Sequence, residues 1–207
     1  MKSFKTILIV VVIGIVAWNS VYFRRLDEVK QSLDAKDFDA AQYASTFWKS
    51  TLPGALVKAI DLTELTTLIS ANEAKAFDDH SHALGIGNLR YFLIKGKGAV
   101  ESVKDDIVII VLANSEQRIA LATEFIFGNA IRDASGLINV NEFTNTMHFN
   151  NVSAEINKIV RETVLPEFKN NVKAGDLVVF TGAIELNREH PDLKDFEVIP
   201  IQISIIK

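Results

Sequence analysis

The chain has 207 residues, of which 22 are lysine or arginine and 26 are aspartate or glutamate, and it contains no cysteine. This length supports one medium-sized domain, or one domain with a smaller appendage. The absence of cysteine excludes disulfides, thiolate metal sites and a lipid-modified cysteine, and the acidic balance argues against nucleic-acid binding. A mean hydropathy of +0.18 is high for a soluble protein and predicts a concentrated apolar segment.

The apolar segment lies at residues 6–23, with basic residues on both sides of it. Its length is at the short end of what crosses a bilayer core of ~30 Å. We therefore predict an uncleaved signal-anchor, a transmembrane helix within residues 1–25 that contacts the lipid bilayer through residues 6–23. The alternative is a cleaved secretory signal, but Trp18 and Asn19 interrupt the small residues that cleavage requires.

This anchor predicts a single-pass protein of the inner (cytoplasmic) membrane with its body in the periplasm. Residues 1–25 carry four basic and no acidic side chains, so the rest of the chain has 18 basic and 26 acidic residues and a net charge of −8. We expect an acidic, soluble body that binds neither nucleic acid nor anionic lipid.

Residues 26–88 have the apolar spacing of helices, and we predict a small helical domain there. Asp37 is placed to cap a helix that runs to Lys49, and Asp61-Leu62-Thr63-Glu64 has the spacing of a capping box. Gly85-Ile86-Gly87-Asn88 marks the end of this domain, because glycine and asparagine favour turns.

From residue 89 onward the pattern becomes that of β-strands. The predicted strands are Arg90–Lys97 with an extension over Ala99–Lys104, Ile107–Ala113, Arg118–Phe127, Leu177–Ala183 and Glu197–Ile206. A helix that begins at Asn151 or Ser153 separates the third strand from the fourth, and Pro166 is expected to bend or end it. Three strands, a helix and two strands are the order of an OB-fold.

We therefore predict an α+β fold in three parts. They are a transmembrane helix at residues 1–25, a small helical domain at residues 26–88, and an OB-like five-stranded β-barrel domain at residues 89–207. The helix between strands three and four belongs to the last part.

Several short motifs resemble a known family, the predicted periplasmic lipoproteins called domain of unknown function 2291. The motifs are Phe38–Tyr43, Phe47-Trp48, Leu52-Pro53, Tyr91–Gly98, Gly128–Ala134, Phe143–Asn145, His148-Phe149, Val152-Ser153, Asn157 and Gly175–Ala183. The resemblance covers residues 7–207. It implies an exported, membrane-tethered protein with a helical and a β-rich part, encoded beside sugar-type ABC transporter components. It implies no catalytic residue.

One departure from the family concerns the anchor. Many members carry a lipobox cysteine at the end of the apolar segment, where this chain reads Ala17-Trp18-Asn19-Ser20. Lipid attachment to a cysteine is therefore excluded here.

The candidate binding residues lie between the third strand and the following helix. Arg132 could clamp a carboxylate or sugar hydroxyls, with Asp133 beside it, in a loop rich in glycine and asparagine. Asn145 and His148 belong to a run of amides interrupted by phenylalanines, and amides with aromatic faces suit a carbohydrate. We predict a ligand site formed by Arg132, Asp133, Asn145 and His148. The alternative is that these residues only cap turns and hold the loop.

Other chemistry is less favoured. His80 and His82 near Asp78 and Asp79 leave a metal site open as a hypothesis, although we predict no metal and no cofactor. His148 has no nucleophile elbow near it, so hydrolysis is not expected.

Our leading interpretation is a membrane-anchored, extracytoplasmic accessory or binding protein that is not an enzyme. The predicted partners are the lipid bilayer and, through the resemblance, components of a sugar ABC transport system or a small carbohydrate ligand. A structural scaffold of an envelope complex and an envelope hydrolase are the alternatives.

Overall fold

The computed structural model describes residues 38–85, 87–113, 115–194 and 196–206. The transmembrane helix predicted within residues 1–25 lies outside these residues. Within the described ranges, no helix is both long enough and apolar enough to cross a membrane. Residues Asp39–Lys207 form one compact unit.

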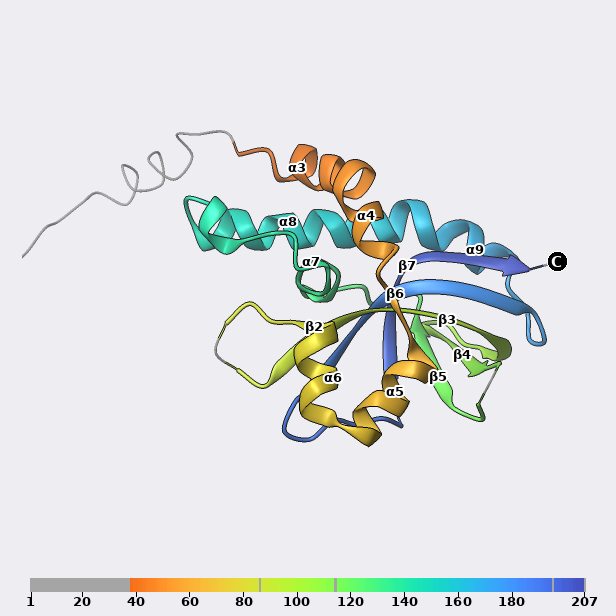
Figure 1. Cartoon of the computed structure of the whole chain (residues 1–207). Coiled ribbons are helices and arrows are strands. Elements are labelled where there is room, and N and C mark those ends of the chain that lie inside the picture. The colour runs from red at the N-terminus through yellow and green to blue at the C-terminus, as the bar shows by residue number, and fades with distance from the viewer. Residues whose placement is uncertain (1–37, 86, 114, 195, 207) are drawn as a thin grey trace, which may run out of the picture. The chain divides into compact units, whose positions relative to one another are not determined.

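Helices occupy the N-terminal part of this unit and the long connection between strands β5 and β6 (Figure 1). They are α3 (Ala40–Thr46), η1 (Phe47–Thr51), α4 (Leu52–Leu56), α5 (Leu62–Ala71), α6 (Glu73–His80), α7 (Ala130–Ser135), η2 (Val140–Glu142), α8 (Thr146–Ile159), η3 (Val160–Val164) and α9 (Leu165–Asn171). η1 and η3 are π-helical, and η2 is a 3-10 turn.

The strands are β1 (Ile60–Asp61), β2 (Ser81–His82), β3 (Leu89–Val103), β4 (Ile107–Leu112), β5 (Arg118–Ala122), β6 (Leu177–Asn187) and β7 (Phe196–Ile206). All seven belong to one sheet. The longest strand, β3, pairs with β1, β2, β4 and β6, while β7 pairs with β5 and β6. The β1–β3 and β5–β7 pairs are parallel, and the others are antiparallel.

The predicted fold class is wrong. In place of a five-stranded barrel, the chain forms a mixed α/β fold with a seven-stranded sheet. Two of its strands, β1 and β2, come from the segment predicted to be purely helical, and both pair with β3. Hydrophobic spacing missed them because each is two residues long, which is too short for a periodic pattern to show.

At Gly98, β3 pairs with two strands at once. This residue pairs with Leu112 of β4 on one side and with Val178 of β6 on the other. A Cβ atom at this position would lie 2.3 Å from the Val111 carbonyl oxygen. Only glycine therefore fits where the three backbones meet.

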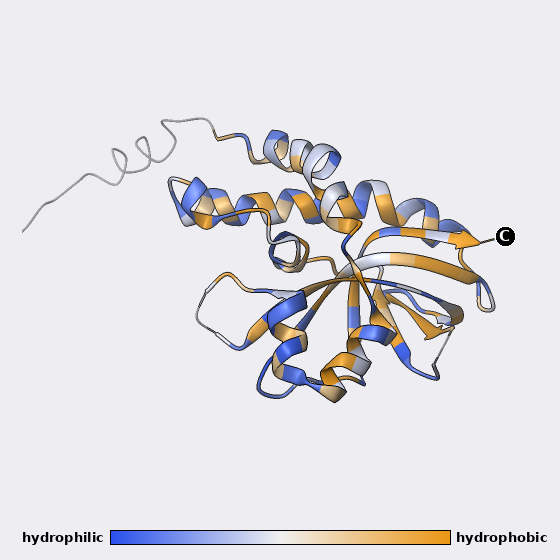
Figure 2. Cartoon of the chain, viewed as in Figure 1, coloured by the Kyte–Doolittle hydropathy of each residue, from blue (hydrophilic) through white to orange (hydrophobic). Residues whose placement is uncertain are grey.

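One long helical segment, α8 continued by η3 and α9, lies across one side of the sheet, and α3 packs along α8 (Figure 1). Figure 2 shows apolar and polar residues alternating along this segment, as expected for a helix with one buried face. Val152, Ile156 and Val160 are the buried residues of that face, each with no more than 1% of its surface exposed. The main core lies between the strands and α5, α6 and α9, around Phe77, Phe92 and Phe180.

The helices begin where short polar side chains cap them. Asp61 accepts hydrogen bonds from the backbone of Thr63 and Glu64 at the start of α5, as its capping-box spacing predicts. Asn145 plays the same part for α8, which begins several residues earlier than expected. The segment between the third predicted strand and Asn151 thus contains α7, η2 and the first turn of α8.

Candidate functional site

Arg132 and Asp133 lie on α7 and form a buried ion pair. Their side chains are only 3% and 1% exposed. Arg132 Nε donates to Asp133 Oδ1 at 2.7 Å, and Arg132 Nη2 donates to Asp133 Oδ2 at 3.2 Å. This two-point contact is the geometry in which a guanidinium binds a carboxylate most strongly. The pair satisfies itself with no external ligand.

Neighbouring groups make further contacts with both members of the ion pair. The Arg132 guanidinium lies over the Phe149 ring, 3.6 Å from its centroid, and Nη1 donates to the Phe149 carbonyl at 3.2 Å. Asn129 Nδ2 donates to Asp133 Oδ2 and to the Tyr91 hydroxyl. Burial, with the negative charge of Glu185, raises the pKa of Tyr91 to about 12. The pair therefore joins α7 to α8 and to β3.

Asn145 and His148 meet at the first turn of α8. Asn145 Oδ1 accepts from the His148 backbone N–H at 2.8 Å, so the Asn145 side chain is the cap of the helix. The His148 ring lies 3.3 Å from Thr144 Oγ1 and 3.4 Å from Asn145 Nδ2. The structure thus brings Asn145 together with His148, and Arg132 with Asp133. The role of these four residues in ligand binding stays a prediction.

A cavity of about 510 Å³ lies beside the Arg132–Asp133 pair, between α8 and the chain that leaves β5. We call it the α8 cavity. It is lined by Ile126, Phe127, Gly128, Asn129, Arg132, Asn150, Ser153, Ala154, Asn157 and Arg161. None of these lining residues is acidic, and none is a histidine. Of the four predicted binding residues, only Arg132 lines it.

Ser153 lies on the wall of the α8 cavity and is the most unusual residue there. It is only 6% exposed, and its Oγ has no hydrogen-bond partner among the described residues. A helical serine often donates to the carbonyl four residues earlier. Here that carbonyl belongs to Phe149 and already accepts from Arg132 Nη1. A buried hydroxyl without a partner is costly.

Arg161 enters the same wall from the π-helical segment η3. The Leu165 N–H donates to the Val160 carbonyl, five residues earlier, immediately before Pro166, which has no N–H. The helix thus continues past the proline with a widened turn. Arg161 Nη1 donates to the Ile126 carbonyl at 2.6 Å, which fixes the guanidinium. Arg161 forms no ion pair with any other described residue.

Two exposed phenylalanines lie in the chain that leaves β5. Phe125 and Phe127 are 61% and 68% exposed, and their rings stack with centroids 6.3 Å apart. Phe127 lines the α8 cavity, and the Arg161 guanidinium lies 5.9 Å from its ring centroid. An aromatic face therefore stands beside the polar wall of the cavity.

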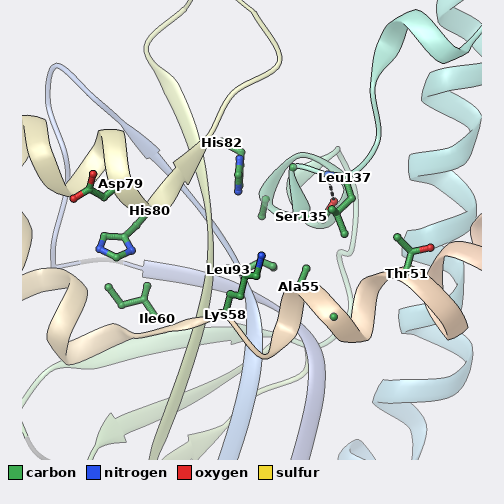
Figure 3. Close-up of a pocket in the computed structure, with 13 residues that line it drawn as sticks. Thr51, Ala55, Lys58, Ile60, Asp79, His80, His82, Leu93, Ser135 and Leu137 are labelled. Carbon is green, nitrogen blue, oxygen red and sulfur yellow. Dashed lines mark hydrogen bonds between the residues drawn. The ribbon is translucent and has the colours of Figure 1, made fainter.

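A second cavity, of about 480 Å³, contains the two histidines considered as metal ligands. Figure 3 shows the His82 side chain directed toward α7, whereas His80 lies beside Asp79. The His82 ring packs closely against Gly136, and burial lowers the pKa of His82. In the part of the chain that the structure describes, no three His, Cys, Asp or Glu residues are grouped as metal ligands.

The sequence contains one pattern that indicates the α8 cavity. Asn150, Ser153, Asn157 and Arg161 follow each other at intervals of three, four and four residues, which places them on one face of a helix. This polar stripe runs beside the apolar stripe of Val152, Ile156 and Val160.

The fold and the cavity define a class of protein, a mixed α/β unit with a helix-covered sheet and a polar cavity under its longest helix. Within that class the chain belongs to the family of predicted periplasmic lipoproteins (DUF2291), which matches residues 11–204 and confirms the resemblance. The body of the chain is accordingly extracytoplasmic.

A crystal structure of an OB-fold protein from Thermotoga maritima MSB8 is similar to this chain. It has 29% sequence identity and a TM-score of 0.71, and the match covers 83% of this chain and 100% of that one. No curated protein matches the chain.

Proposed function

We propose that this protein is an extracytoplasmic accessory or binding protein, not an enzyme, and that its α8 cavity holds a small hydroxylated ligand. The observation that carries the proposal is Ser153, a buried hydroxyl with no partner on the wall of a polar cavity. A bound hydroxyl group would supply the missing hydrogen bond. The volume of about 510 Å³ lies within the range of small-molecule sites.

The composition of the cavity supports binding over catalysis. Its described lining offers amide, hydroxyl and guanidinium groups but no carboxylate and no imidazole to act as a general base. An association with a sugar transport system, which the resemblance to the family implies, is part of the proposal and depends on that resemblance.

The experiment is a thermal-shift screen of the full chain against neutral and acidic monosaccharides. A ligand at ~100 times its Kd stabilises the folded state by ~2.7 kcal/mol, which raises the melting temperature measurably. We expect at least one sugar to do so, and the Ser153→Ala variant to lose the shift.

The matched control is Ser70→Ala. Ser70 is also a helical serine, but its Oγ donates to the Thr66 carbonyl at 2.8 Å and it lies on α5, away from the cavity. This variant should keep the full shift. No shift with any sugar, or a full shift in Ser153→Ala, contradicts the proposed function.

A structural scaffold is the second candidate, and the Arg132–Asp133 pair favours it. The pair is buried and satisfied within the protein, as expected of residues that hold elements together. A chain that binds no sugar but is captured with other envelope proteins, and loses this when Arg132 is replaced, would fit the scaffold.

A further inference from the structure

The two arginines of the α8 cavity differ in whether an acidic side chain neutralises their positive charge. Arg132 is neutralised by Asp133, whereas Arg161 has no ion-pair partner among the described residues. Because no acidic side chain lines the cavity in the described part of the chain, its wall carries one uncompensated positive charge. This is notable in a chain with a net charge of −4.

We infer that the ligand of the α8 cavity is a hydroxylated monocarboxylate of the sugar-acid class, whose carboxylate binds Arg161. This inference rests on the proposed function and names the substrate class of the same site.

The hydrogen bonds of Arg161 support a carboxylate. Nη1 donates to the Ile126 carbonyl, which orients the planar group, and the Nε–Nη2 edge has no acceptor among the described residues. Two parallel N–H groups on one edge match the two oxygens of a carboxylate. The edge is held in place before binding, so less entropy is lost when a ligand arrives.

The polar side chains on α8 that line the cavity can form hydrogen bonds with the hydroxyl groups of the ligand. Ser153 Oγ has no hydrogen-bond partner in the described part of the chain. Asn157 donates through Nδ2 to the Gly128 carbonyl at 2.8 Å, which leaves its Oδ1 as an acceptor. Asn150 is exposed on the same lining and offers both a donor and an acceptor. These three side chains lie on the face of the α8–η3 segment that also carries Arg161.

The exposed ring of Phe127 in the cavity lining favours a ligand with a sugar ring over an open-chain polyol. Phe127 is 68% exposed and lines the cavity, so an apolar C–H face of the ligand can cover it. Phe125 stacks against Phe127. A pyranose has such a face on one side and hydroxyl groups at its rim.

One guanidinium also distinguishes a carboxylate from a phosphate. A phosphate ester carries close to two negative charges at neutral pH and is usually held by several cationic or backbone N–H groups. Among its described lining residues the α8 cavity has one cation without an ion-pair partner, Arg161, which balances a single carboxylate.

The test is isothermal titration of the full chain with two matched pairs, D-glucuronate with D-glucose and D-galacturonate with D-galactose. The members of each pair differ only in the carboxylate at C6. We expect the acid of at least one pair to bind at least ~10-fold more tightly than its neutral partner, because hydrogen bonds between two charged groups are stronger than those between neutral groups. In Arg161→Gln this preference should disappear.

The control variant is Arg118→Gln. Arg118 is an exposed arginine paired with Glu101 at 2.8 Å, outside the α8 cavity, so this variant should keep the preference. Equal affinities within both pairs overturn the inference but leave the proposed function standing. A preference that survives in Arg161→Gln, or glucose 6-phosphate binding more tightly than glucuronate, also overturns it. If no sugar or sugar acid binds, the inference and the proposed function fall together.

Discussion

Arg132 and Arg161 line the same cavity, but they differ in how many of their hydrogen-bond donors are already bound within the protein. Arg132 is 3% exposed and bound by Asp133, Phe149 and the Phe149 carbonyl. Arg161 is half-buried and has one backbone acceptor. Side chains that satisfy one another hold a structure together, whereas a side chain with unused donors is available for binding.

The same contrast separates two serines. Ser135 Oγ donates to the Arg132 carbonyl at 2.6 Å and accepts from the Leu137 N–H at 3.2 Å. Ser153 Oγ has no partner among the described residues. Ser135 therefore has hydrogen bonds at the C-terminal end of α7. Ser153 lines the cavity with a buried hydroxyl that has none among the described residues.

The largest effect should come from breaking the buried ion pair. Arg132→Met leaves the Asp133 carboxylate buried without its partner, which we expect to lower the free energy of unfolding by about 3–5 kcal/mol. Urea denaturation followed by circular dichroism measures this loss.

The double variant Arg132→Met/Asp133→Leu is the control, because it removes both charges. It should recover part of the lost stability, since two apolar side chains replace a desolvated pair. A single variant as stable as the parent would show that the pair is not structural.

Replacing Arg161 should cost far less. Arg161→Gln removes one hydrogen bond to the Ile126 carbonyl, which corresponds to about 1 kcal/mol of unfolding free energy. The same denaturation experiment measures it. A loss as large as that of Arg132→Met would mean that Arg161 is also a structural residue, and the contrast would fail.

Replacing Ser153 should leave the protein equally stable or raise its unfolding free energy by up to about 1 kcal/mol. Ser153→Ala removes a buried hydroxyl that has no partner and therefore removes a desolvation cost. Ser135→Ala, in which two hydrogen bonds are lost, should be destabilising. If Ser153→Ala is the more destabilising of the two, the hydroxyl has a structural partner after all.

The smallest effect at neutral pH concerns Tyr91, on the satisfied side of the contrast. Its pKa of about 12 lies above the ordinary value of 10.0. The stability that comes from keeping the hydroxyl neutral is therefore complete below pH 10 and is lost as pH rises from 10 towards 12. Unfolding measured at pH 9 and pH 11 should show a smaller alkaline loss in Tyr91→Phe than in the parent. Equal losses would argue against this burial.

Much of the local structure follows from residue patterns. The predicted strand Ile107–Ala113 is observed as Ile107–Leu112, and Leu177–Ala183 is observed within Leu177–Asn187, because both are continuous apolar runs. Arg118–Phe127 was predicted too long. Phe125 and Phe127 continue the alternation of a strand, but the chain leaves the sheet after Ala122 and exposes them. Hydrophobic alternation alone therefore does not distinguish a buried aromatic residue from an exposed one.

The candidate site was harder to predict for a related reason. Arg132, Asp133, Asn145 and His148 stand out by residue type, yet two of them form an internal ion pair and Asn145 caps a helix. Ser153 does not stand out, because its lack of a partner depends on Arg132 occupying the Phe149 carbonyl. That competition arises from tertiary structure and has no local pattern in the sequence.

The most direct test of the account is the location of the ligand by NMR. The side-chain amide signals of ¹⁵N-labelled full-length protein are followed while D-glucuronate or D-galacturonate is added. The account predicts that the signals of Asn150 and Asn157, in the α8 cavity, shift with saturation, while the signal of Asn145 stays in place. Shifts confined to Asn145, with Asn150 and Asn157 unchanged, would contradict it.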